Sequence, residues 1–122
     1  MTNTENFGYL GYNFQLKILN LIITDKLFAQ SIIDSIQSKY FDNQYFKLIM
    51  QMMKEYYEKY QSIPSFEGIE QLTQLEISSE MAKKCVIDML RDVKEASFED
   101  HLFIKEKTIK FCKQQELKKA IR

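Results

Sequence analysis

Apolar residues recur at intervals of three and four positions along most of the chain, which is the period of an α-helix. The pattern is interrupted several times, and short polar residues that favour helix N-termini stand at the interruptions: Asp25, Asp42 or Asn43, Ser65, and Ser78 or Ser79. We therefore expect six helices, over residues 14–24, 26–36, 43–61, 66–75, 79–96 and 98–122. The chain has only three glycines and one proline, and it lacks the Asn-Gly or Asp-Gly pair of a tight β-hairpin. The sequence thus predicts an all-α fold.

The third expected helix, residues 43–61, is apolar or aromatic over most of its circumference. Such a helix needs neighbours on several sides, so we expect it at the centre of the core. Tyr57 or Tyr60 near its end has an alternative interpretation as an anchor in a protein contact, because tyrosine combines an apolar ring with a polar tip. The expected core comprises Ile18, Ile22, Ile33, Phe46, Ile49, Met53 and Tyr56.

The six helices are expected to form two groups. The first four make a small helical bundle over residues 14–76, preceded by an N-terminal tail over residues 1–13. The last two, joined by the short segment "SFED", make an antiparallel helical hairpin over residues 77–122. The final helix keeps its helical character to Arg122 without a stop residue, so we expect the natural polypeptide to continue.

Composition and charge place the chain among globular intracellular proteins. Hydrophobic residues make up 45% and charged residues 28%, and no apolar run or signal sequence suits a membrane. Seventeen basic and seventeen acidic residues cancel, but residues 99–122 hold seven basic against four acidic residues. We expect this excess to form a solvated helix face; weak contact with nucleic acid or with an acidic partner is the alternative.

Few residues suit catalysis or metal binding. Cys85, Cys112 and His101 are too few for a structural zinc site, and both cysteines are expected as buried free thiols in a reducing compartment. Phosphate-binding, dinucleotide-binding and hydrolase motifs are absent. We therefore expect no catalytic residue, no metal and no cofactor in this chain, and no enzyme activity of its own.

Two segments resemble a known family. The first is "LIITDKLFAQSIIDSIQSKYFDNQYFKLIMQMMKEYYEKYQSIPSFEGIEQL", in which a helix pair leads through an aromatic step into a long helix, a tyrosine-rich turn and a Pro-Ser helix start. The residues that match these features are Tyr40, Phe41, Tyr56, Tyr57, Tyr60, Pro64 and Ser65. The second is "FIKEKTIKFCKQQELKKAI", residues 103–121. Together they resemble the N-terminal domain of DnaB-type replicative DNA helicases. The opening "NFGYLGYN" differs from the acidic, alanine-containing start of bacterial members, which favours the phage-like branch.

This resemblance implies a function for the chain. It implies a non-catalytic N-terminal assembly and partner-docking domain of a hexameric replicative helicase, in the cytoplasm of a bacterium or a phage-infected host. Such a domain pairs with its own copies through the helical hairpin and presents a surface to primase, while its DNA contact is weak or indirect. The ATPase would lie in a second domain.

Five apolar residues of the expected hairpin are candidates for the self-contact: Met81, Met89, Phe98, Phe103 and Phe111. Each of them has an alternative place in the hairpin core. The alternative function is a free-standing helical regulator or adaptor that binds nucleic acid or protein through the basic sixth helix. A Walker motif downstream in the same reading frame would distinguish the two functions.

Overall fold

Short polar side chains begin four of the helices by capping their first turns. Asp25 accepts a hydrogen bond from the Phe28 amide, and Asn43 accepts one from the Tyr45 amide. Ser65 and Ser79 do the same for the fourth and fifth helices. Each cap satisfies an amide that the helix itself leaves without a partner. The four helix starts predicted from the sequence are therefore confirmed, with Asn43 and Ser79 as the caps where two candidates were open.

The computed structural model describes residues 5–96 and 99–121. Its elements, in chain order, are η1 (Phe7–Leu10), α1 (Tyr12–Thr24), α2 (Lys26–Ile32), η2 (Ser38–Tyr40), α3 (Gln44–Tyr60), α4 (Phe66–Glu76), α5 (Glu80–Glu95) and α6 (His101–Ile121), where η denotes a 3₁₀ turn. This part of the chain contains six α-helices and no strand, so the predicted all-α fold is confirmed.

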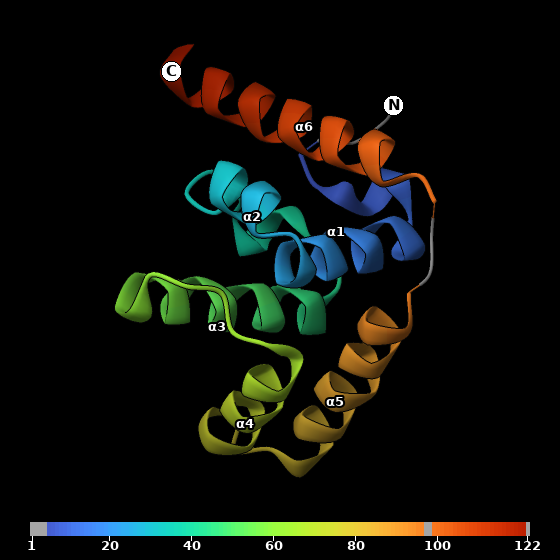
Figure 1. Ribbon diagram of the computed structural model, residues 1–122, viewed down its shortest axis with the longest axis vertical. Helices are drawn as coiled ribbons and strands as arrows, with labels where there is room; N and C mark the ends of the chain where they lie inside the picture. Colours follow the sequence, from blue (N-terminus) through green and yellow to red (C-terminus); the bar gives the residue numbers. More distant parts are fainter. Residues whose placement is uncertain (1–4, 97–98, 122) are drawn as a thin grey trace.

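The first helix, α1, is the element around which the others pack. It contacts η1, α2, α5 and α6, and seven of its thirteen residues are buried. Figure 1 shows α6 on one side of α1, with α3 and α4 on the other. The sequence favoured the third helix for this place because it is apolar over more of its circumference. In the structure α3 buries Phe46, Ile49, Met50, Met52 and Met53, but Tyr56 and Tyr57 are half-buried and Tyr60 is exposed.

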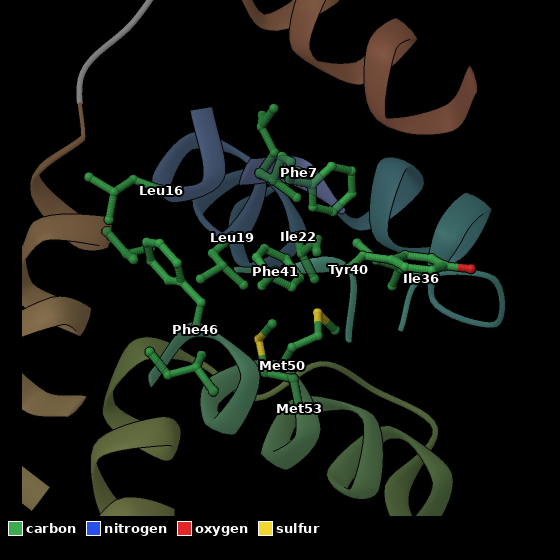
Figure 2. Packing of buried hydrophobic residues seen from close by; sticks show 14 of the residues in the cluster. Phe7, Leu16, Leu19, Ile22, Ile36, Tyr40, Phe41, Phe46, Met50 and Met53 are labelled. Carbon is green, nitrogen blue, oxygen red and sulfur yellow. The ribbon is translucent and has the colours of Figure 1, made fainter. Parts of the chain in front are cut away.

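Four aromatic rings join distant parts of the chain beside α1. The Phe7 ring lies 4.5 Å from that of Phe111 and 5.2 Å from that of Phe41, and the Tyr40 and Phe111 rings are 5.2 Å apart between centroids. Figure 2 shows Phe7, Tyr40 and Phe41 among the buried side chains. Phe7 is fully buried. Of the segment expected as a tail, Phe7 thus belongs to the core and Leu10 packs against it, whereas Tyr9 is exposed.

The fifth and sixth helices do not pair as the expected antiparallel hairpin. Among the described residues, α5 packs against α1, α3 and α4, whereas α6 packs against α1 and α2 (Figure 1). The apolar stripe of α5, which includes Val86, Leu90 and Val93, is fully covered by those three helices. This stripe of α5 is therefore not available for contact with α6. The two helices are neighbours in the chain but cover different sides of α1.

A buried amide fixes the start of α3 against α1. The Gln15 side chain donates from Nε2 to Asp42 Oδ1 at 3.0 Å and accepts the Asp42 backbone amide at 3.2 Å. Because Gln15 is fully buried, this paired arrangement satisfies both ends of its amide.

In the described part of the chain, no helix is long and apolar enough to cross a membrane.

Candidate functional site

The five candidate contact residues lie in different environments. Met89 is 7% exposed and Phe111 is 2% exposed, so both belong to the core. Met81 and Phe103 are exposed, but Met81 is near the start of α5 and Phe103 near the start of α6. Phe98 lies outside the described residues. The structure therefore does not bring the five together in one surface, although it leaves two of them accessible.

The last helix, α6, has apolar side chains on two opposite sides. Its inner side, formed by Ile104, Thr108, Phe111 and Cys112, is buried. Its outer side presents Leu102 at 77% exposure and Leu117 at 63%. A shallow groove of about 650 Å³ runs along this side, lined by Glu106, Lys107, Ile109, Lys110, Lys113, Gln114 and Leu117. We call these residues, with Leu102 and Phe103, the α6 outer face.

Several contacts hold α6 in place beneath this face. Lys105 forms an ion pair with Asp25, the residue that caps α2. Lys17 of α1 pairs with Asp100 at 3.5 Å, just before α6 begins. The Phe14 and Phe103 rings meet edge to face at 6.4 Å. The outer face is thus presented by a helix that is fixed on the body of the domain.

A second apolar surface lies between α3 and α4. Two adjoining hollows of about 170 and 280 Å³ share Met52, Glu55 and Glu76 in their walls. The remaining wall residues are Leu48, Gln51, Tyr56, Lys59, Tyr60, Leu72 and Ile77. The Tyr56 and Tyr60 rings lie 4.6 Å apart, and the Lys59 ammonium stands 5.5 Å from the Tyr60 ring centroid. We call this surface the α3–α4 groove.

The two surfaces carry opposite charge. The α6 outer face has three lysines and one glutamate, a net charge of +2, on a helix whose net charge is +4 with His101 neutral. The α3–α4 groove has Glu55, Glu76 and Lys59, a net charge of −1, within residues 55–80, whose net charge is −5. These two regions nearly balance each other in a chain that is neutral as a whole. The fields of the two surfaces are nevertheless distinct, since charges more than about 10 Å apart are screened from one another at moderate salt.

A smaller hollow of about 250 Å³ lies beside the end of α6. It is lined by Lys39, Lys118 and Lys119, together with Glu5, Asn6, Tyr40 and Gln115. The hydroxyl of Tyr40 is buried and is the one buried side-chain polar atom without a hydrogen-bond partner in the described part of the chain. Burial raises the pKa of this hydroxyl, with smaller contributions from Cys112 and Glu116. The raised pKa keeps this hydroxyl protonated at neutral pH.

The two cysteines lie in different environments. Burial raises the pKa of the Cys112 thiol to about 12, which keeps it protonated and unreactive at neutral pH. Both cysteines are free, as expected, but Cys85 is half-buried where a buried thiol was predicted. Within residues 5–96 and 99–121, no group of three or more histidine, cysteine or acidic residues could hold a metal ion. What these residues do offer is two apolar surfaces of opposite charge.

The sequence contains a signal for one of these surfaces. Leu102, Ile109 and Leu117 are seven and eight positions apart, which places them on one side of a helix, away from Ile104 and Phe111. This second stripe could have indicated an outer contact face. The α3–α4 groove has no comparable signal, because its walls come from two helices whose relative placement is set by tertiary packing.

Comparison of the chain with models of protein families, with curated protein sequences and with solved structures finds no match.

Proposed function

We propose that this chain is a non-catalytic assembly and partner-docking domain of a hexameric replicative DNA helicase of the DnaB type, on its phage-like branch. The proposal combines the resemblance of residues 21–72 and 103–121 with the two exposed apolar surfaces. In this role the domain binds its own copies and primase, and it hydrolyses no ATP. Its location would then be the cytoplasm of a bacterium or of a phage-infected cell.

The observation that supports a docking role most directly is the α6 outer face. Leu102 and Leu117 are large aliphatic side chains that remain more than half exposed, although the same helix buries an apolar stripe on its inner side. Burial of apolar surface is favourable by about 25 cal/mol per Å², so a partner that covers both side chains gains binding energy there. Exposed apolar side chains with a polar rim are typical of a protein contact site.

Direct titration of the chain with the primase of the same genome tests the docking role. We expect saturable binding by calorimetry, and we expect a Leu102→Ser/Leu117→Ser variant to lose it with an unchanged melting temperature. The matched control is Leu27→Ser on α2, a leucine that is 80% exposed and is not one of the residues of the α6 outer face. If the parent fails to bind, or if the double variant binds as the parent does, this face is not the primase contact.

A nucleic-acid adaptor is the second candidate, because Lys107, Lys110 and Lys113 are all exposed along α6. Phosphate contacts by these lysines would give affinity that falls steeply with salt. Fluorescence anisotropy with single-stranded and duplex DNA measures this dependence. Binding at physiological salt that is lost in a Lys110→Gln/Lys113→Gln variant would favour the adaptor over the helicase domain.

A further inference from the structure

The two charged surfaces lie at opposite ends of the molecule. Figure 1 is drawn with the longest axis vertical, and it places α6 at one end and α4 at the other. The packing agrees, since α6 lies against α1 and α2 whereas α4 lies against α3 and α5. A single copy therefore cannot bring its α6 outer face to its own α3–α4 groove. A second copy can do so.

The two surfaces also match in length and in chemistry. From Leu102 to Leu117 the α6 outer face spans roughly 22 Å, and from Leu48 to Tyr60 the wall of the groove spans roughly 18 Å, at 1.5 Å per helical residue. The groove offers apolar walls and two glutamates, Glu55 and Glu76, which line both of its hollows. The α6 outer face offers exposed leucines with exposed Lys110 and Lys113 beside them.

Pairing of like surfaces is electrostatically unfavourable. If two copies met through their α6 outer faces, two surfaces of net charge +2 would face each other. If they met through their α3–α4 grooves, two acidic regions would do so. Like charges brought together at an interface oppose association, whereas opposite charges both attract and fix the register.

We propose that this domain associates with itself head to tail, with the α6 outer face of one copy seated in the α3–α4 groove of the next. The occupant of the groove is thus a basic amphipathic helix of a second copy. The inference rests on the proposed assembly role in that both involve self-association. Because primase is proposed to bind the same α6 outer face, primase and a second copy would compete for it. A contact between two different surfaces repeats from copy to copy, so it produces a closed ring or an open chain and not merely a dimer.

Two charge-reversed variants test the contact from each side. Variant A is Lys110→Glu/Lys113→Glu on α6, and variant B is Glu55→Lys/Glu76→Lys on the groove; all four residues are exposed. Sedimentation velocity from about 1 to about 200 µM covers the range of weak specific contacts. We expect the parent to form species larger than a dimer whose size falls with added salt. We expect A alone and B alone to remain monomeric.

Mixing the two variants gives the decisive result. In an equimolar mixture, the intact groove of A can bind the intact α6 of B, so association should return. A contact between two like surfaces predicts a different result. If α6 met α6, variant B would associate by itself; if groove met groove, variant A would do so. Return of association on mixing supports the head-to-tail contact. If variant A alone or variant B alone associates as the parent does, the head-to-tail contact is wrong.

Matched controls separate this contact from a general effect of charge. The control for A is Lys84→Glu/Lys94→Glu on α5, and the control for B is Asp34→Lys/Glu95→Lys; these residues are exposed and outside both surfaces. Both controls should associate as the parent does. A parent that stays monomeric throughout overturns the inference, while the docking role is then judged by the primase titration alone. If the parent associates and the substitutions of A and B leave association unchanged, the head-to-tail contact is wrong, although the assembly role remains.

Discussion

Phe46 is fully buried, and its ring lies 5.2 Å from that of Tyr12 and 6.0 Å from that of Phe41. It therefore joins α3 to the start of α1 and to the segment that precedes α3 itself. A side chain packed on several sides by different elements leaves a cavity that the surroundings cannot fill when it is removed. The change in the free energy of unfolding when Phe46 is replaced therefore tests whether α3 is packed in the core.

We predict that Phe46→Ala lowers the free energy of unfolding by about 3–5 kcal/mol, the range for large aromatic residues in well-packed cores. Urea denaturation followed by circular dichroism measures the change. The control is Leu75→Ala on α4, where the side chain is 83% exposed and the expected change is within about 0.5 kcal/mol. Equal effects of the two substitutions would mean that α3 is not packed as described.

For the buried hydroxyl of Tyr40 we expect its removal to raise the stability of the fold. Since this atom has no hydrogen-bond partner, Tyr40→Phe removes a polar group that is unfavourable to bury and keeps the ring that contacts Phe7 and Phe111. We predict an increase of about 1 kcal/mol in the free energy of unfolding. Tyr12→Phe is the control, because its hydroxyl donates to Asp92 at 3.1 Å at the surface. A clear loss of stability in Tyr40→Phe would show that the hydroxyl has a partner in solution.

Individual residues could be predicted where a helical period marks them. Ile18, Ile22, Ile33, Phe46, Ile49 and Met53 were expected in the core from their spacing and are buried. Phe7 and Tyr40 were missed because they lie in 3₁₀ turns of three or four residues, which are too short to show a period. Only the tertiary structure brings them together with Phe111.

At the scale of elements, Asp25 connects two helices that are far apart in the chain. Its carboxylate caps α2 through the Phe28 amide and pairs with Lys105 of α6. The interaction with Lys105 is the largest cause that lowers the pKa of Asp25 below 3.8, and the Phe28 amide is the next. A lowered folded-state pKa means that the charged form stabilises the fold. This contribution is present above the unfolded pKa and is lost as the pH falls through the folded one.

We predict that Asp25→Asn is less stable than the parent at neutral pH and that the difference disappears as the pH falls below 3.8 and through the lowered folded-state pKa. Asparagine keeps the ability to cap α2, so the loss reports the ion pair with Lys105. Thermal melts of both proteins across this pH range measure it. Asp88→Asn is the control, since its pair with Arg91 at 3.7 Å is exposed and should contribute little. A difference that persists unchanged in acid would contradict the prediction.

The starts of four helices were predictable from the sequence, but the end of α2 at Ile32 instead of Ile36 and the packing of the last two helices were not. Caps such as Ser65 and Ser79 act within one turn, so their signal is local and survives in any tertiary context. A short connection makes α5 and α6 consecutive but does not set the angle between them. Moreover, α6 has apolar residues on two sides, so its sequence does not say which side is buried. The same ambiguity hides which side of α6 stays exposed.

At the scale of the whole molecule, the fold depends on contacts between its first and last helices. The first helix, α1, lies against α6, and Phe7 near the start of the chain lies against Phe111. We predict that a chain ending at residue 96 loses fixed side-chain packing, because Phe7, Tyr40 and one side of α1 would then face water. Near-ultraviolet circular dichroism and dye binding to exposed apolar surface measure this loss. The full chain with Leu117→Ser, which changes only an exposed residue of α6, should keep its packing.

The position of α1 between α5 and α6 also has a consequence during protein synthesis. Ribosomes add about 5–20 residues per second, and α1 leaves the ribosome long before the residues that cover it have been made. Through that interval Phe7 and Phe14 have no complete surroundings, because Phe111 and Phe103 come about 90 to 100 positions later. The nascent chain must therefore keep an apolar helix without its final cover for several seconds. Chaperones that bind exposed apolar segments would therefore find one in α1 until α5 and α6 have emerged to cover it.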